Sequence, residues 1–245
     1  MAGPLPDRFQ PRALIFGAIG TLAETSDIQR AAFNRAFSEA GLDWDWDWDM
    51  ETYLRLLGQP GGKARIEAYA EEVGARVDAT ALHDAKVRHF TETIARDGLA
   101  PRPGVAETIA AAKGEGMAVA LASTTTPGTV ESIFDAMRPE VTAGDFDFIG
   151  TRGAADAPKP APDIYRACLD ALGITASDAV AIEDTPESAR AAVDAGIATY
   201  AYPGRAAEGR DFPGVMDVLE QLDPVRILAM DPCTGTRPIT ERARP

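Results

Sequence analysis

The fold of this chain is decided by the stretch Arg12-Ala13-Leu14-Ile15-Phe16-Gly17-Ala18-Ile19-Gly20-Thr21-Leu22. Its first half is a short apolar run, and two glycines follow directly after it. An apolar run of this length that ends at glycine is typical of a buried strand leading into a tight turn. The stretch therefore predicts a buried strand with a glycine turn at its carboxyl end.

Four further apolar runs alternate with helical patterns along the chain. Such alternation is the signature of a parallel sheet whose strands are joined by crossover helices. We therefore expect an α/β fold with a Rossmann-like parallel-sheet core. The predicted strands span residues 13–17, 117–122, 146–150, 179–182 and 198–202. The predicted helices of the core span residues 105–115, 127–137, 162–172, 186–195 and 215–222.

The segment between the first two predicted strands is too long for a single crossover. It has a mostly helical pattern, with helices predicted over residues 28–40, 50–57, 63–73 and 79–95. We therefore expect residues 26–96 to form an inserted helical cap domain. The core is then discontinuous and consists of residues 1–25 and 97–245, of which about 224–245 are a C-terminal extension. The run Pro101-Arg102-Pro103-Gly104 marks the return to the core, because proline restricts the backbone there.

Composition excludes several classes of partner. The chain has 245 residues and a net charge of −14, which repels nucleic acids and anionic membrane surfaces at long range. No apolar stretch approaches the roughly 20 residues needed to span a bilayer.

The two cysteines of the chain, Cys168 and Cys233, make neither a disulfide framework nor a metal-binding pair, and Cys168 is expected to be a buried thiol. The N-terminus lacks the pattern of a signal peptide, so we expect a cytoplasmic protein.

Polar residues follow two of the predicted strands and occupy one proline-rich loop. Ser123 and Thr124 come after one strand, Glu183 and Asp184 come at the end of another, and Lys159 stands between two prolines. Hydroxyl groups, helix N-termini and an ammonium group are the usual ligands of a phosphate. The simpler alternative is that the hydroxyl residues cap a helix and that the two acids complement a helix dipole.

In order and spacing, the glycine turn and these three groups resemble the four motifs of the haloacid dehalogenase superfamily. The first motif of that superfamily reads Asp-x-Asp-Gly-Thr. The resemblance implies that the first aspartate attacks phosphorus and that the second acts as general acid and base. In this sequence the two positions hold Gly17 and Ile19, which have neither a nucleophile nor a proton to offer. No intact catalytic residue is therefore expected.

The resemblance also implies a magnesium ion, held by the first aspartate, a backbone carbonyl and an acid of the fourth motif. Glu183 and Asp184 still supply carboxylates here, but the ligand at position 17 is missing. Because magnesium prefers near-octahedral oxygen coordination, we expect no cofactor, or Mg²⁺ bound at most weakly.

Over residues 12–204 the chain further resembles the Calvin-cycle-associated branch of sugar-bisphosphate phosphatases, which is close to β-phosphoglucomutase. The resemblance rests on short runs such as Lys159-Pro160-Ala161-Pro162-Asp163-Ile164-Tyr165. It implies that Gly61, Gly62 and Lys63 form a cap loop over the substrate, with Lys63 and Arg65 as contacts of a distal phosphate. Gln29 replaces a common histidine and Pro60 replaces a hydroxyl residue, so several pocket positions differ from the branch together.

Two segments lie outside these motifs. The run Trp44-Asp45-Trp46-Asp47-Trp48-Asp49 is either an aromatic platform for a sugar or partner, or a cap connection whose tryptophans pack between helices; the second alternative is favoured. Residues 227–230 either add an edge strand or lie against the core. The polar tail from Thr234 onward is expected to be poorly ordered.

Three functions remain open from the sequence. The preferred hypothesis is a phosphatase-fold protein without aspartyl-phosphate chemistry that binds a phosphorylated metabolite or a protein partner. The second is a residual or altered hydrolase acting on sugar phosphates. The third is a structural or regulatory subunit of a protein complex. Fold alone does not decide among them.

Overall fold

The computed structural model describes residues 11–46, 51–58 and 61–228. Within these residues six parallel strands form one sheet in the order β3-β2-β1-β4-β5-β6. The glycine-ended strand of the opening stretch is β1, which lies between β2 and β4 and is fully buried. The strands are β1 (Ala13–Gly17), β2 (Ala118–Ala122), β3 (Phe148–Gly150), β4 (Ala179–Glu183), β5 (Ala198–Ala201) and β6 (Asp217–Val218).

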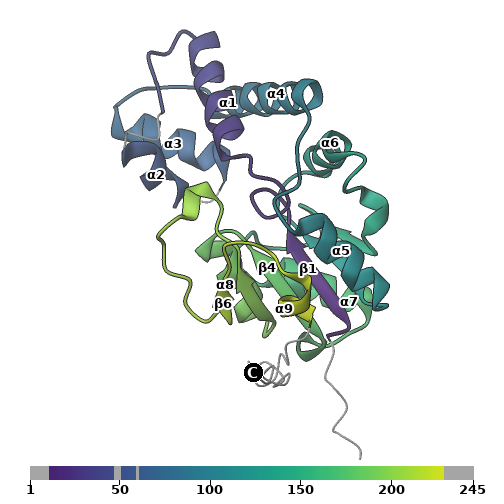
Figure 1. Ribbon diagram of the computed structural model, residues 1–245. Coiled ribbons are helices and arrows are strands. Elements are labelled where there is room, and N and C mark those ends of the chain that lie inside the picture. Colours follow the sequence, from purple (N-terminus) through teal and green to yellow (C-terminus); the bar gives the residue numbers. More distant parts are fainter. Residues whose placement is uncertain (1–10, 47–50, 59–60, 229–245) are drawn as a thin grey trace, which may run out of the picture.

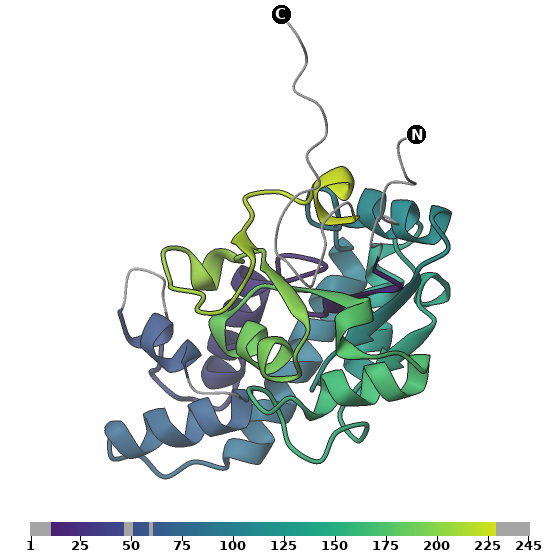
Figure 2. The ribbon, with the colours of Figure 1, turned by 90° about the horizontal axis from the view of Figure 1, so that it is seen from below.

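Side chains alternate between the two faces of the sheet and bury a separate core on each. Leu14 and Phe16 of β1 belong to one core, together with residues of α5 (Val105–Gly114) and α6 (Pro127–Met137). Ala13 and Ile15 belong to the other core, which α7 (Asp163–Leu172) and α8 (Pro186–Asp194) cover. In Figure 2 the strands lie between the teal helix α5 and the green helices α7 and α8. The expected α/β class with a parallel-sheet core is confirmed.

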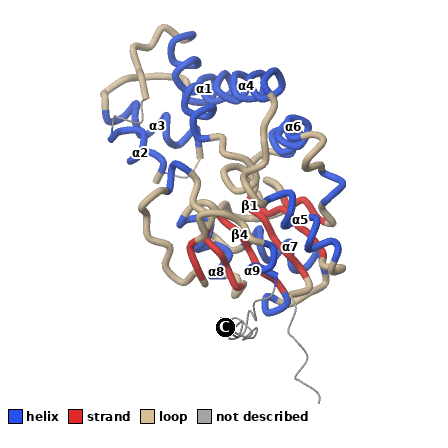
Figure 3. The backbone as a smooth tube through the Cα atoms, in the orientation of Figure 1, coloured by secondary structure: helices blue, strands red, loops and turns tan. Residues whose placement is uncertain are grey.

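Four further helices gather beyond the carboxyl edge of the sheet (Figures 1 and 3). They have an apolar core of their own, in which Phe33 and Phe37 pack against Trp46 with ring centroids 4.8 Å apart in both pairs. These helices are α1 (Ser26–Glu39), α2 (Glu51–Leu57), α3 (Gly62–Glu72) and α4 (Ala79–Asp97). We refer to them as the cap helices.

The tryptophan segment connects two cap helices. Trp46 is completely buried, and Trp44 packs edge-on against Phe37. The packing alternative is therefore correct for these two residues, and an exposed aromatic platform is wrong for Trp46. Trp48 lies outside the described residues. Cys168 is buried on α7 as a free thiol, as expected.

The C-terminal part of the core differs from two sequence predictions. The helix predicted over residues 215–222 is wrong, because Asp217–Val218 form the edge strand β6 beside β5. The backbone N–H groups of Met216 and Leu219 donate to carbonyls of β5, and a local helical pattern of eight residues is too weak to compete with this pairing. The alternative of an edge strand at 227–230 is also wrong for its described part, since Pro224–Leu228 are helical (α9) and Ile227 is buried. The tail from Thr234 lies outside the described residues.

None of the described helices combines the length and the apolar character that crossing a membrane requires.

The return from the cap helices to the core is fixed by an arginine. Arg102 donates hydrogen bonds to the carbonyls of Gly20 (2.6 Å), Tyr202 (2.8 Å) and Pro203 (2.6 Å), and its guanidinium stacks on the ring of Tyr202. Two positions later Gly104 has a φ of +83°, and its backbone lies directly against Leu222. The loop after β1, the loop after β5 and the start of α5 are therefore held together at this point.

We predict that Gly104→Ala lowers the free energy of unfolding far more than Gly116→Ala does. Both glycines have positive φ, a conformation that costs an alanine about 1–2 kcal/mol. Only at Gly104 does an added Cβ also meet backbone, 2.1 Å from the carbonyl oxygen of Leu222, whereas nothing lies within 4 Å at Gly116. Urea unfolding of the two variants measures the difference. Equal losses of stability would contradict the described packing of Gly104.

Candidate phosphate site at the carboxyl edge of the sheet

The carboxyl ends of β1, β2 and β4 meet where the strand order reverses on either side of β1. Open α/β sheets place their ligands in the crevice at such a point. The sheet thereby brings Gly17, Ser123 and Glu183 to one edge, and Lys159 reaches the same edge from the loop before α7. The four sequence motifs thus converge in space, as their spacing predicted.

Glu183 is the most enclosed charged group of this edge, with 1% of its side chain exposed. It accepts hydrogen bonds from Lys159 and from the hydroxyl of Tyr165, and it lies 3.4 Å from the hydroxyl of Thr21. Burial, together with the negative charge of Glu183, raises the pKa of Tyr165 well above its ordinary value. Lys159 also donates to the carbonyl of Ala122 at 3.0 Å. The Lys159–Glu183 ion pair therefore joins the ends of β2 and β4.

The carboxylate of Glu183 fills the space beside Gly17. A Cβ added to Gly17 would lie 2.3 Å from Glu183 Oε2 and 2.5 Å from Thr21 Oγ1. Gly17 does not have a positive φ, so a side chain there is opposed not by backbone conformation but by the ends of the Glu183 and Thr21 side chains, which would have to shift. The place where a residue at position 17 would begin its side chain is occupied by an acid of the fourth motif.

Asp184 lies next to Glu183 and faces the other way, into a cavity. Its carboxylate accepts a hydrogen bond of 3.1 Å from Thr21 and is so close to Gly20 that a Cβ at that glycine would lie 1.9 Å from Asp184 Oδ2. Burial, and then repulsion by Glu183, raise the pKa of Asp184 to about 7. The charge of Lys159 thus acts on both adjacent carboxylates, although only Glu183 is in contact with it.

This arrangement offers few side-chain ligands to a magnesium ion. The charge of Glu183 is already neutralised by Lys159, which leaves Asp184 as the one described carboxylate of the pair that faces the cavity. In the described part of the chain no group of three His, Cys, Asp or Glu side chains is placed to hold a metal. Because magnesium keeps several of its waters and is usually bound through one or two carboxylates, Asp184 alone would hold it weakly.

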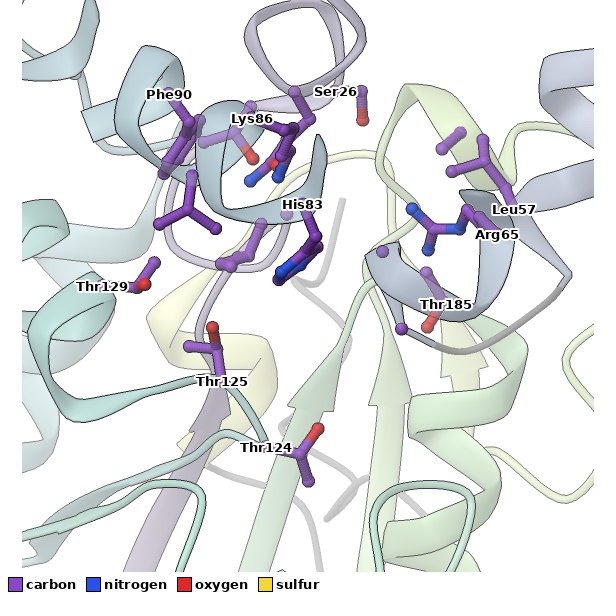
Figure 4. Close-up of a pocket in the computed structure, with 18 of the residues that line it drawn as sticks. Ser26, Leu57, Arg65, His83, Lys86, Phe90, Thr124, Thr125, Thr129 and Thr185 are labelled. Carbon is purple, nitrogen blue, oxygen red and sulfur yellow. The ribbon is translucent and has the colours of Figure 1, made fainter. Parts of the chain in front are cut away.

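A cavity of about 520 Å³ separates the cap helices from the carboxyl edge of the sheet (Figure 4). On the sheet side it is bounded by hydroxyl residues at the N-termini of α6 and α8, where Thr126 and Thr185 each accept a hydrogen bond from a backbone N–H of the first turn. The cap side supplies bases, among them Arg65 of α3 and His83 and Lys86 of α4. Its polar lining includes Ser26, Arg65, His83, Lys86, Thr124, Thr125, Thr126, Arg152, Asp184 and Thr185.

The basic side chains of this cavity repel one another in a poorly hydrated space. Burial, and then the charge of Arg65, lower the pKa of Lys86 to about 7. Burial, and then the charge of Lys86, lower the pKa of His83. Burial also lowers the pKa of Arg65. Although the whole chain is acidic, this cavity concentrates cationic groups, an arrangement that favours an anionic ligand.

The predicted site residues divide into two groups. Ser123 is buried and its hydroxyl accepts from the N–H of Thr125 at 3.2 Å, while Lys63 is half-exposed and pairs with Glu67 at 3.7 Å. These two residues, together with Gly17, Lys159 and Glu183, are not part of the cavity lining. The predicted residues that do line the cavity are Ile19, Gly61, Gly62, Arg65, Thr124 and Asp184.

The sequence motifs missed three basic residues of the cavity, namely His83, Lys86 and Arg152. His83 and Lys86 are three residues apart and therefore lie on one helix face together with Phe90, a pattern that was available in the sequence. Arg152 lies in the loop after β3, and no local pattern marked it. Gly62 has a role beside His83, because a Cβ there would lie 2.8 Å from the imidazole ring.

We predict that Lys159→Met destabilises the fold by about 3–5 kcal/mol, because it leaves the buried carboxylate of Glu183 without its cation. The double variant Lys159→Met, Glu183→Leu should recover most of this loss, since both charges are then removed together. Chemical unfolding of the parent, the two single variants and the double variant gives the coupling energy. Additive losses would show that the ion pair does not hold this edge together.

We also predict a pH dependence of stability that originates at Asp184. Its pKa of about 7 in the folded state lies above its ordinary value of 3.8, so its contribution to stability is present in acid and is lost as pH rises through about 7. Asp184→Asn should therefore gain stability relative to the parent between pH 5 and pH 8 in the presence of a chelator. Parallel unfolding curves with no change in this difference would contradict the prediction.

Comparison with known proteins agrees with this geometry. The pattern of the haloacid dehalogenase-like hydrolases matches residues 11–196. Protein CbbY of Cupriavidus necator is 41% identical over 222 residues, which cover 87% of each chain. Protein CbbY of Rhodobacter capsulatus is 36% identical over 204 residues, covering 82% of this chain and 89% of the relative.

Solved structures agree as well. The crystal structure of a CbbY mutant from Rhodobacter sphaeroides in complex with xylulose-(1,5)bisphosphate has a TM-score of 0.78 and 34% identity, covering 86% of this chain and 94% of the other. A crystal structure of CbbY from the same organism in complex with phosphate has the same TM-score. By its sequence, its parallel sheet and its converging motifs, the chain belongs to the haloacid dehalogenase-like hydrolase family.

Proposed function

We propose that this protein binds a phosphorylated sugar in the cavity under the cap helices, without magnesium and without aspartyl-phosphate chemistry. The observation that carries the proposal is the position of Glu183. Its carboxylate fills the space where the nucleophile's side chain would begin, and it neutralises the lysine of the third motif. We further propose that residues 26–96 act as the cap of this site and that the protein works in the cytoplasm.

The loss of chemistry follows from the side chains at the first motif. Gly17 has no group that attacks phosphorus, and Ile19, which lines the cavity, has no proton to donate to a leaving group. Among the described residues Asp184 is the acid of the motifs that still faces the cavity, and its raised pKa favours the neutral form that neither attacks phosphorus nor holds a metal well.

The lining supports a phosphate at each end of the ligand. On the sheet side, Thr124 and the N-termini of α6 and α8 present hydroxyl groups and backbone N–H groups, which suit an anion. On the cap side, Arg65 supplies positive charge. A bisphosphate ligand is known for a CbbY that is 34% identical to this chain. Ser123 and Lys159 do not line the cavity, and their predicted role in phosphate binding stays a prediction.

The ligand class is tested by calorimetry with xylulose 1,5-bisphosphate, the compound bound by CbbY of Rhodobacter sphaeroides, measured with magnesium and again with a chelator. We expect binding of equal strength in both conditions. Arg65→Met should weaken it at least tenfold, the effect of losing a hydrogen bond to a charged group of about 1.5–3 kcal/mol. Lys63→Met is the matched control on the same helix, because Lys63 is half-exposed and pairs with Glu67, and it should leave the affinity unchanged.

A phosphate-release assay on the same compound separates binding from hydrolysis. We expect no magnesium-dependent turnover by the parent. Turnover that requires magnesium and disappears in Asp184→Ala would overturn the proposal in favour of an altered hydrolase. Absence of binding under both conditions would favour a structural or regulatory role with a protein partner.

A further inference from the structure

Lys86 is a buried amine that the proposed phosphate chemistry does not fully explain. It projects from α4 toward the cavity with 8% of its surface exposed (Figure 4). Its ammonium nitrogen lies 5.0 Å from the ring centroid of Phe33 and 5.2 Å from that of Phe90, and it donates to the side-chain oxygen of Gln29. Within residues 11–46, 51–58 and 61–228 no carboxylate forms an ion pair with it.

The charged groups around Lys86 come from four elements. Arg65 of α3 and His83 of α4 are basic, as is Arg152 in the loop after β3, while Asp84 and Asp184 are the acids that line the same cavity. Burial, and then the charge of Arg65, lower the pKa of Lys86. An amine that titrates near neutrality has a substantial unprotonated fraction, and a desolvated lysine next to another cation is a good nucleophile toward carbonyl groups.

The other three lysines of the chain lack this environment. Lys63 is half-exposed and paired with Glu67, and Lys159 is bound to Glu183. Lys113 is exposed and donates to the carbonyl of Asp145 at 3.1 Å. Lys86 therefore differs from every other lysine of this sequence in being both enclosed and without an acidic partner among the described residues.

A proton acceptor lies on the same helix face. His83 precedes Lys86 by three residues and also lines the cavity. Burial and the charge of Lys86 lower the pKa of His83, which keeps its imidazole neutral at neutral pH. The ring packs closely against Gly62, where any larger residue would collide with it. A neutral imidazole beside an amine is suited to carry protons to and from a carbonyl oxygen.

We propose that Lys86 captures the carbonyl group of an open-chain sugar phosphate as an imine, with His83 transferring the protons. The proposal rests on the proposed function, since it assigns a reactive group to the same cavity. The ligand class is an aldehyde or ketone sugar whose ring closure is blocked. A ketopentose 5-phosphate belongs to this class, because its phosphorylated O5 cannot attack the C2 carbonyl to form a five-membered ring.

The step balances without any further reactant. The lone pair of Lys86 Nζ forms a bond to the carbonyl carbon while the carbonyl electron pair moves to the oxygen. His83 carries one proton from the nitrogen to this oxygen, which gives a carbinolamine with one N–H and one O–H. His83 then carries the second proton from the nitrogen to the hydroxyl group, which leaves as water as the C=N bond forms. Amine and carbonyl thus give imine and water, and the reverse reaction releases the sugar phosphate unchanged.

The test is chemical trapping. The protein is incubated with xylulose 5-phosphate and cyanoborohydride, which reduces an imine to a stable secondary amine, and the adduct is located by mass spectrometry of peptides. We expect one adduct, at Lys86, at least tenfold more abundant than at any other lysine. Xylitol 5-phosphate, which lacks the carbonyl, should bind but form none. Lys86→Arg should abolish the adduct, and the matched control Lys113→Met should retain it.

The outcomes separate this proposal from the proposed function. If both compounds bind in calorimetry and no adduct forms at Lys86, the imine is wrong and the binding function stands. If neither compound binds, both proposals fail. An adduct spread evenly over Lys63, Lys113 and Lys86 would show unselective amine chemistry and overturn the assignment. Because the adduct is mapped in the unmodified sequence, the test does not depend on whether the Lys86 variant folds.

Discussion

The buried ion pair between Lys159 and Glu183 holds together the edge of the sheet on which every other feature of the site depends. Lys159 comes from the loop before α7 and also binds the carbonyl at the end of β2, while Glu183 ends β4. Two buried charges are tolerated at such a point only when they are paired and their remaining hydrogen bonds are satisfied. Tyr165 and Thr21 supply those hydrogen bonds to Glu183.

The Lys159–Glu183 pair is closed off from the cavity, and its two charges neutralise each other. The cavity itself is lined by the basic residues Arg65, Lys86 and Arg152, in a protein whose net charge is −14. Basic groups that are enclosed together are unfavourable unless a ligand offsets their repulsion. The cavity is therefore best understood as a binding site for an anion whose charge completes it. Its size of about 520 Å³ is within the range of small-molecule sites.

Much of the fold was predictable, because strand periodicity and glycine turns are local signals. β1 was predicted to the residue, as was α6, whose first residue is the proline after Thr126. The helix predicted over residues 215–222 was wrong because the structure of this segment depends on pairing with β5, which no local pattern reveals. In the site, the convergence of the motifs followed from the topology of a parallel sheet. The contacts did not, since the burial of Lys159 against Glu183 and the approach of His83 and Lys86 to the cavity depend on how distant elements pack.

The position of Glu183 beside Gly17 has a consequence for substitutions at position 17. An aspartate restored at position 17 would place its Cβ 2.3 Å from a Glu183 oxygen, so the glutamate would first have to leave the place it now fills. It would then be separated from Lys159 and Tyr165, which now hold it. A side chain at position 17 is thus coupled to the Lys159–Glu183 pair, so a change at any of these three positions affects the other two.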